Sequence, residues 1–135
     1  MEDYGYLVRC AIDMLKFSYA PYSRFKVGAA LLAKNGKVYG GCNIENAAFS
    51  PTNCAERTAF FRALAEGVRE FDAIAVVGGS NGELTDYCPP CGVCRQVMRE
   101  FCSPSEFKII LAVSETEYKV YTLSELLPLG FKDEL

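Results

Sequence analysis

Residues 26–42 read KVGAALLAKNGKVYGGC, and this stretch decides the fold. Residues 26–33 are almost continuously apolar, which predicts a strand buried on both faces. The Asn35-Gly36 pair that follows is a strong signal for a tight hairpin turn. We therefore expect residues 37–42 to form a second strand, antiparallel to the first.

The same kind of pattern continues on both sides of this hairpin. Three further apolar segments predict strands at residues 72–79, 107–113 and 118–123. Helical spacing, Pro and Gly predict helices at residues 3–18, 50–66, 90–102 and 124–127, with Ser50 as the cap of the second. This order predicts an α/β fold in one domain spanning residues 1–135: a three-layer α-β-α sandwich with a mixed five-stranded sheet. Strands joined through the second and third helices should run parallel, by right-handed crossovers.

The composition excludes several classes of function. The chain has 135 residues and a net charge of −3, from 14 basic and 17 acidic side chains, which disfavours nucleic acid as a partner. Its apolar runs are far shorter than the ~20 residues that span a bilayer, so we expect no membrane partner. The chain has no histidine, which excludes Ser-His-Asp and Cys-His catalysis and every His-ligated metal site.

Seven cysteines make the thiols the most informative residue type. The first ten residues, MEDYGYLVRC, lack the basic and apolar regions of a signal peptide, so we expect a cytoplasmic protein with reduced thiols. The last four residues, KDEL, match a retrieval signal of the secretory pathway. Without a signal peptide we interpret that match as coincidental.

Three of the thiols are spaced to meet at one point. Cys91 and Cys94 form a CxxC motif at a helix start, and Cys54 is predicted at the start of the preceding helix. In a parallel arrangement both helix starts lie at one sheet edge, where three thiolates can hold one Zn²⁺ per chain. Three protein ligands leave a fourth position open, which is typical of a catalytic site. Glu56 is then placed for acid–base catalysis, and Arg57 for hydrogen bonds to the ligand sulfurs.

Each half of this pattern has a simpler explanation. Glu56 in a first helical turn is ordinary complementation of the helix dipole. The CxxC motif alone is also compatible with a redox pair, and Cys88 with the other three thiols makes a closed, non-catalytic four-cysteine zinc module possible. The joint pattern, Cys-x-Glu followed by Pro-Cys-x-x-Cys, is that of zinc nucleobase deaminases, and it is far more specific.

Over nearly its whole length the chain resembles the cytidine deaminases, specifically the short, homotetrameric type. Four segments carry the resemblance: APYSRFKVGAAL at 20–31, GCNIENA at 41–47, CAER at 54–57 and PCGVCRQ at 90–96. The tail LLPLGF at 126–131 is similar to the end of that family. Enzymes of this kind hydrolyse cytidine and deoxycytidine to uridine, deoxyuridine and ammonia in pyrimidine salvage.

The resemblance also implies a role for each matching residue. Cys54, Cys91 and Cys94 would bind zinc, with Glu56 as the proton shuttle and Arg57 supporting the sulfurs. The implied substrate contacts are Phe25 on the pyrimidine, Asn43 and Glu45 on the ribose hydroxyls, the backbone of Ala55 on the base, and Phe131 from a neighbouring subunit. The blasticidin S deaminases share the Cys-x-Glu pattern and are the nearest alternative, although Asn43, Glu45 and Phe131 favour a nucleoside.

Overall fold

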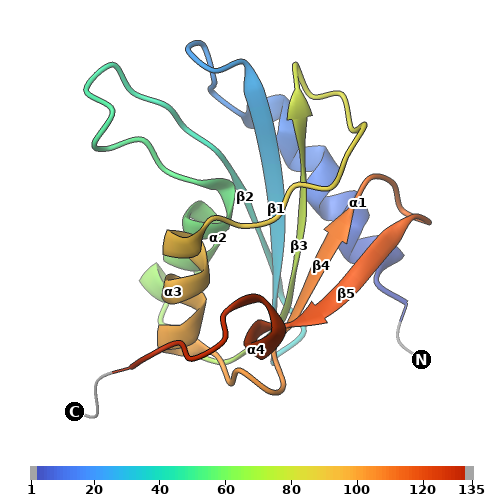
Figure 1. Cartoon of the computed structure of the whole chain (residues 1–135), viewed down its shortest axis with the longest axis vertical. Coiled ribbons are helices and arrows are strands. Elements are labelled where there is room, and N and C mark those ends of the chain that lie inside the picture. The colour runs from blue at the N-terminus through green and yellow to red at the C-terminus, as the bar shows by residue number, and fades with distance from the viewer. Residues whose placement is uncertain (1–2, 133–135) are drawn as a thin grey trace.

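A five-stranded sheet forms the centre of the computed structural model, which describes residues 3–132 (Figure 1). Across the sheet the strands follow the order β2-β1-β3-β4-β5. Their bounds are β1 Phe25–Ala33, β2 Val38–Cys42, β3 Phe71–Ser80, β4 Lys108–Ala112 and β5 Tyr118–Thr122. The helices are α1 Gly5–Asp13, the 3-10 helix η1 Met14–Phe17, α2 Ala55–Ala65, α3 Gly92–Phe101 and α4 Leu123–Leu126.

The strand directions confirm the predicted mixed sheet. β1 pairs antiparallel with β2 on one side and with β3 on the other. β2 and β3 therefore point the same way, and β3 is parallel to β4. The edge strand β5 closes the sheet antiparallel to β4. Because β2 leads into α2 and β3 leads towards α3, both helices begin at the same end of the sheet.

Two apolar cores, one on each face of the sheet, confirm the three layers. Ile74 and Val76 of β3 lie in the core shared with α2 and α3, whereas Ala75 and Val77 lie in the core under α1. This alternation follows from the period of two in a strand. Figure 1 shows α1 on one face of the sheet and α2 with α3 on the other.

The glycine at position 41 sets how closely α2 approaches the sheet. A β-carbon on Gly41 would lie 2.3 Å from the carbonyl oxygen of Ala55 and 2.6 Å from the amide nitrogen of Ala59. Both of those atoms belong to the backbone of α2, so a side chain here would push the helix away. The first turn of α2 is therefore held against β2 by the absence of a side chain.

The prediction that Ser50 caps the second helix is wrong. The helix begins at Ala55, and Cys54 is its N-cap with φ −77° and ψ 155°. Residues 47–51 form turns instead: the amide of Asn46 donates to the hydroxyl of Thr52 across the loop, and Phe49 has a left-handed φ of 65°. The third helix likewise begins later than predicted, at Gly92, with Cys91 as its N-cap. Both corrections place a cysteine at the boundary of a helix.

The predicted first helix is α1 followed by η1, so its last turn is tighter than an α-helix. Three residues of the terminal KDEL sequence, 133–135, lie outside the described residues. Within residues 3–132, every helix is too short or too polar to cross a membrane.

Candidate functional site

The thiols of Cys54, Cys91 and Cys94 converge, as the sequence predicted. Their sulfur atoms all lie within 4.8 Å of one another, and those of Cys54 and Cys91 are 4.0 Å apart. Cys54 and Cys91 cap the starts of α2 and α3, and Cys94 lies in the first turn of α3. The cluster forms because β2 and β3 run in the same direction and bring both helix starts to one sheet edge.

The spacing and chemistry of this cluster fit one zinc ion per chain. A tetrahedral zinc with Zn–S bonds of about 2.3 Å requires sulfur atoms roughly 3.8 Å apart. The 4.0 Å between Cys54 and Cys91 is close to that separation. Three thiolates are soft ligands suited to zinc, and a three-ligand set leaves one coordination position for a non-protein ligand.

Arg57 and the sulfur atoms stabilise thiolate character within the cluster. The contact with Cys94 and the guanidinium of Arg57 lower the pKa of Cys54 to about 5, although burial opposes the shift. The same contact raises the pKa of Cys94, so a single thiolate forms first in the pair. Arg57 donates from Nη2 to the sulfur of Cys54 at 2.9 Å, as its expected supporting role requires.

Glu56 is the buried carboxyl group next to the thiols. Only 4% of it is exposed. Burial raises its pKa to about 7, with a smaller contribution from the charge of Cys54. A divalent cation held by the three thiols would oppose this shift. A carboxyl group that exchanges a proton near neutral pH is suited to general acid–base catalysis.

Cys88 lies outside the three-thiol cluster. It precedes α3 in irregular backbone, and its sulfur packs against Gly78 of β3. Burial is the main cause that raises its pKa to about 11, and the charges of Glu56 and Cys54 add to the shift. Among the described residues, the ligand atoms that lie within 4.8 Å of one another are those of Cys54, Cys91 and Cys94, without Cys88, which argues against the closed four-cysteine module.

The backbone ties the segment of the predicted sugar contacts to the residue that precedes Cys54. Ile44, which lies between Asn43 and Glu45, pairs with Asn53 through two backbone hydrogen bonds of 3.0 and 2.9 Å. Asn53 directly precedes Cys54. The segment 43–45 is therefore fixed in the backbone beside residue 53, directly before the start of α2.

Asn43 is largely engaged with the start of β1. Its Nδ2 donates to the carbonyl of Phe25 at 2.7 Å, and its Oδ1 accepts from the amide of Val27 at 2.9 Å and from the hydroxyl of Ser18. Both lone pairs of Oδ1 are thus used, and one N–H of the amide group remains available. Asn43 can offer a ligand only a donor.

The remaining predicted contacts occupy three different environments. Phe25 is 38% exposed and lines a hollow of about 280 Å³ with Gly78 and Tyr87, so it is not a core residue. Ala55 is fully buried and forms the first residue of α2. Phe131 is 69% exposed, and within the chain its carbonyl accepts from the side chain of Gln96 on α3. In a single chain Phe131 is not gathered with the others.

The sequence reasoning missed the two hydroxyl groups that support this region. Ser18 donates to Asn43, and Ser23 donates to Glu45. Ser23 lies in the quoted APYS segment, where the sequence alone indicates only a turn. Nothing in the spacing of Ser18 and Ser23 indicates that their hydroxyls face residues 43 and 45, so the sequence holds no signal for these contacts.

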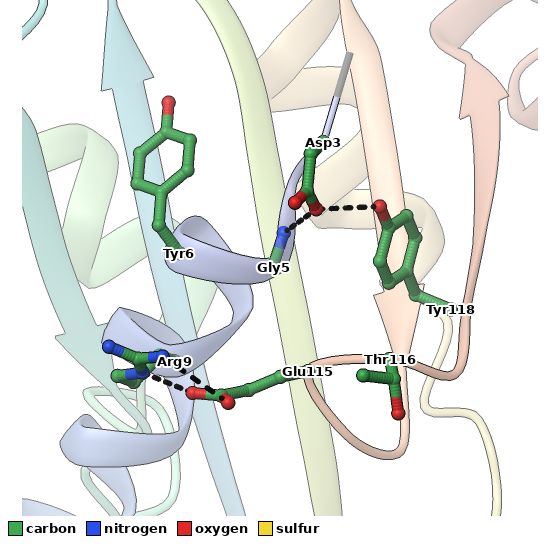
Figure 2. A pocket seen from close by; sticks show the side chains of 7 residues that line it. All are labelled: Asp3, Gly5, Tyr6, Arg9, Glu115, Thr116 and Tyr118. Atoms are coloured by element: carbon green, nitrogen blue, oxygen red, sulfur yellow. Dashed lines mark hydrogen bonds and ion pairs between the residues drawn. The ribbon is translucent and has the colours of Figure 1, made fainter. Parts of the chain in front are cut away.

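A hollow of about 520 Å³ lies on the α1 side of the sheet and has none of the three thiols in its lining. Figure 2 shows that its charged side chains pair with their neighbours: Arg9 with Glu115, and Asp3 with the hydroxyl of Tyr118 and the amide of Gly5. Because these groups already bond to one another, we take the thiol cluster as the candidate functional site.

Comparisons with known proteins agree with the geometry. The family described as cytidine and deoxycytidylate deaminase zinc-binding region matches residues 1–110. Cytidine deaminase of Sporosarcina psychrophila is 51% identical over 87% of this chain and 82% of its own length. Cytidine deaminase of Halalkalibacterium halodurans is 50% identical over 95% and 93%, respectively. The crystal structure of cytidine deaminase from Burkholderia pseudomallei is 47% identical, with a TM-score of 0.85, and the match covers 97% of this chain and 100% of that one.

Proposed function

The chain belongs to the cytidine and deoxycytidylate deaminase family, and from this premise we propose that it deaminates free nucleosides. The reaction consumes one water, converts cytidine to uridine or deoxycytidine to deoxyuridine, and releases ammonia. The observation that carries the proposal is the buried carboxyl group of Glu56 beside three convergent thiols.

Cys54, Cys91 and Cys94 hold the zinc ion in this proposal. When bound, zinc supplies Lewis acidity that makes a water molecule nucleophilic near neutral pH. Arg57 offsets the negative charge of the three thiolates through its bond to Cys54. Without that offset, three thiolates around one Zn²⁺ carry a net charge of −1 and hold protons on water more strongly.

Glu56 moves the protons of the reaction. Its carboxylate accepts a proton from the attacking water and delivers it to N3 of the pyrimidine, while oxygen adds to C4. Glu56 then takes the second proton from the oxygen added at C4 and passes it to the exocyclic nitrogen; the C4–N bond breaks, ammonia leaves, and the C4 carbonyl forms. Burial of Glu56 favours its protonated form and a nearby cation favours its carboxylate, and these opposed effects suit a group that both accepts and donates a proton.

The sugar and base are held by residues of the neighbouring loops. The free N–H of Asn43 donates to a sugar hydroxyl, and the carboxylate of Glu45 accepts from it. Phe25 packs on the pyrimidine, and the backbone of Ala55, at the start of α2, contacts the base. Phe131 stacks on the base of the substrate that is bound in a neighbouring subunit, which agrees with the exposure of Phe131 in the single chain.

We further infer a homotetramer that works in the cytoplasm, in pyrimidine salvage. Several large apolar side chains lie exposed on the single chain, which supports burial against other copies; Phe49, Phe61, Leu129 and Phe131 are among them. Seven cysteines without a disulfide among them agree with a reducing compartment.

The first test is the loss of ultraviolet absorbance and the release of ammonia when the zinc-loaded protein is mixed with cytidine. Glu56→Gln should retain one zinc per chain and lose at least about a hundredfold in kcat, the usual size of an acid–base contribution. Glu66→Gln is the matched control, because Glu66 lies exposed at the other end of α2, paired with Lys37. Turnover of blasticidin S but not cytidine would move the assignment to that deaminase class. Full activity in Glu56→Gln would refute the proposed role.

A further inference from the structure

The carboxylate of Glu45 accepts three hydrogen bonds from the turn that precedes β1. The backbone amides of Tyr22 and Ser23 donate to Oε1 of Glu45 at 3.0 and 3.1 Å, and the hydroxyl of Ser23 donates to Oε2. These three bonds fix both oxygen atoms of one side chain. A carboxylate on a surface loop would otherwise rotate freely about its terminal bonds.

The direction of the hydroxyl bond follows from the groups around Ser23. Its Oγ accepts from the amide of Phe25 at 3.0 Å, so its own hydrogen is free to point at Glu45. The turn that carries Ser23 is itself fixed: the amide of Arg24, at a left-handed φ of 60°, bonds to the carbonyl of Ala20. Ser23 is thus a preorganised donor rather than a mobile one.

The remaining acceptor capacity of Glu45 is correspondingly restricted. An ionised carboxylate has about four acceptor positions, and the turn occupies three of them. The free position lies on Oε2, the oxygen that Ser23 orients. Hydrogen bonding to Ser23 lowers the pKa of Glu45, which keeps the carboxylate ionised and ready to accept. A hollow of about 230 Å³ opens beside it, lined by Tyr22, Phe49 and Thr52.

We propose that Ser23 is a positioning residue for the substrate, because its hydroxyl orients the Glu45 carboxylate that receives a sugar hydroxyl. This inference rests on the proposed function. Ser23 does not touch the reacting atoms; it acts through Glu45. Its loss should therefore weaken recognition of the sugar and leave the base chemistry at the thiol cluster unchanged.

The first experiment measures kcat and KM for cytidine in the zinc-loaded wild type, Ser23→Ala, Glu45→Ala and the double variant. Ser23→Ala should raise KM about tenfold with little change in kcat, the size expected for one lost hydrogen bond to a charged group. In the Glu45→Ala background the same change should have almost no effect, since its partner is gone. Ser23→Thr, which keeps the hydroxyl, should restore KM. Ser105→Ala is the matched control, because Ser105 is exposed and bonds only to the Ser103 hydroxyl among the described contacts.

A second experiment separates positioning from a general structural role. Competitive inhibition constants are measured for uridine and for 2′,3′-dideoxyuridine, which lacks the 2′ and 3′ hydroxyls of the sugar. Ser23→Ala should weaken uridine about tenfold and leave dideoxyuridine unchanged. Should Ser23→Ala fail to fold, Ser23→Cys offers the same comparison with a side chain of similar size and a weak donor.

The outcomes separate this inference from the proposed function. Equal weakening of both inhibitors, or an equal loss in the Glu45→Ala background, would show that Ser23 is merely structural and would overturn the inference alone. A zinc-loaded wild type that leaves cytidine untouched would overturn the proposed function, and this inference with it.

Discussion

Replacing Gly41 with alanine should damage stability and activity together, because a backbone contact sets the place of α2. The added β-carbon would lie 2.3 Å from the carbonyl oxygen of Ala55, whereas ordinary contacts begin near 3.4 Å. Relief of this clash requires α2 and β2 to separate by roughly 1 Å. Alanine fits the strand conformation itself, so the effect comes from packing alone.

The size of the stability loss depends on the atoms that the new methyl group contacts, which belong to the backbone of α2. Overpacking a core costs about 1–3 kcal/mol, and the upper end applies where backbone rather than a side chain must move. A loss of about 3 kcal/mol lowers the melting temperature by roughly 10 °C in a chain of this size. The same shift moves Cys54 and Glu56, and a 1 Å misplacement of catalytic groups can reduce activity about a hundredfold.

The assay compares three glycine variants in thermal unfolding, zinc content and cytidine turnover, at equal protein concentration and metal loading. Gly40→Ala would meet the flexible end of Met14, 2.6 Å from the sulfur, and should cost about 1 kcal/mol. Gly92→Ala faces open space at the start of α3 and should stay within about 1 kcal/mol of the wild type. If Gly41→Ala melts and turns over like Gly92→Ala, the close approach of α2 is not what holds the site.

Three other substitutions give separate readouts. Arg57→Ala removes the 2.9 Å bond to Cys54 and should weaken zinc about ten- to a hundredfold in chelator competition; unchanged affinity would make Arg57 a mere surface charge. Cys88→Ser should keep one zinc per chain, measured by elemental analysis, and loss of that zinc would instead favour a four-cysteine site. Ser18→Ala should raise KM for cytidine less than about threefold, because Asn43 keeps its bonds to two backbone groups. A tenfold rise would show that Ser18 orients Asn43 in the way that Ser23 orients Glu45.

The sheet could be predicted because its strands satisfy a simple rule of burial. Residues 26–33 are nearly all apolar, and strands of that kind lie at the centre of a sheet with helices on both sides. The Asn35-Gly36 turn fixed the antiparallel partner, and chain order supplied the parallel direction of the strands that follow. None of these steps needs a contact between distant side chains.

The start of α2 could not be predicted in the same way, because it depends on tertiary pairing. Ser50-Pro51 is a good local signal for a helix, yet residues 47–51 form turns. The two backbone bonds between Ile44 and Asn53 hold the chain extended up to Cys54, so helical geometry begins only afterwards. A strand partner nine positions earlier in the sequence thus overrides the local preference.

The convergence of the three thiols could nevertheless be predicted, since it depends on topology and not on the first residue of a helix. The supporting hydroxyls could not, because nothing in the spacing of Ser18 and Ser23 indicates which loop they face. Their partners follow from the parallel bridge between Tyr19 and Ile44, which is a feature of the folded chain only.

Because of that bridge, the sugar contacts at residues 43–45 and the thiol cluster should respond differently to substitutions. Segment 43–45 lies between Tyr19 on one side and Asn53 on the other, bonded to both through the backbone. Main-chain bonds therefore anchor the backbone of the sugar contacts, whereas separate bonds from residues 18–27 orient their side chains. Loss of the Ser23 hydroxyl should free Oε2 of Glu45 without moving Cys54, whereas a side chain at Gly41 should displace Cys54 and Glu56 together. A KM effect in the first case and a joint loss of zinc, kcat and stability in the second are the expected signatures of that division.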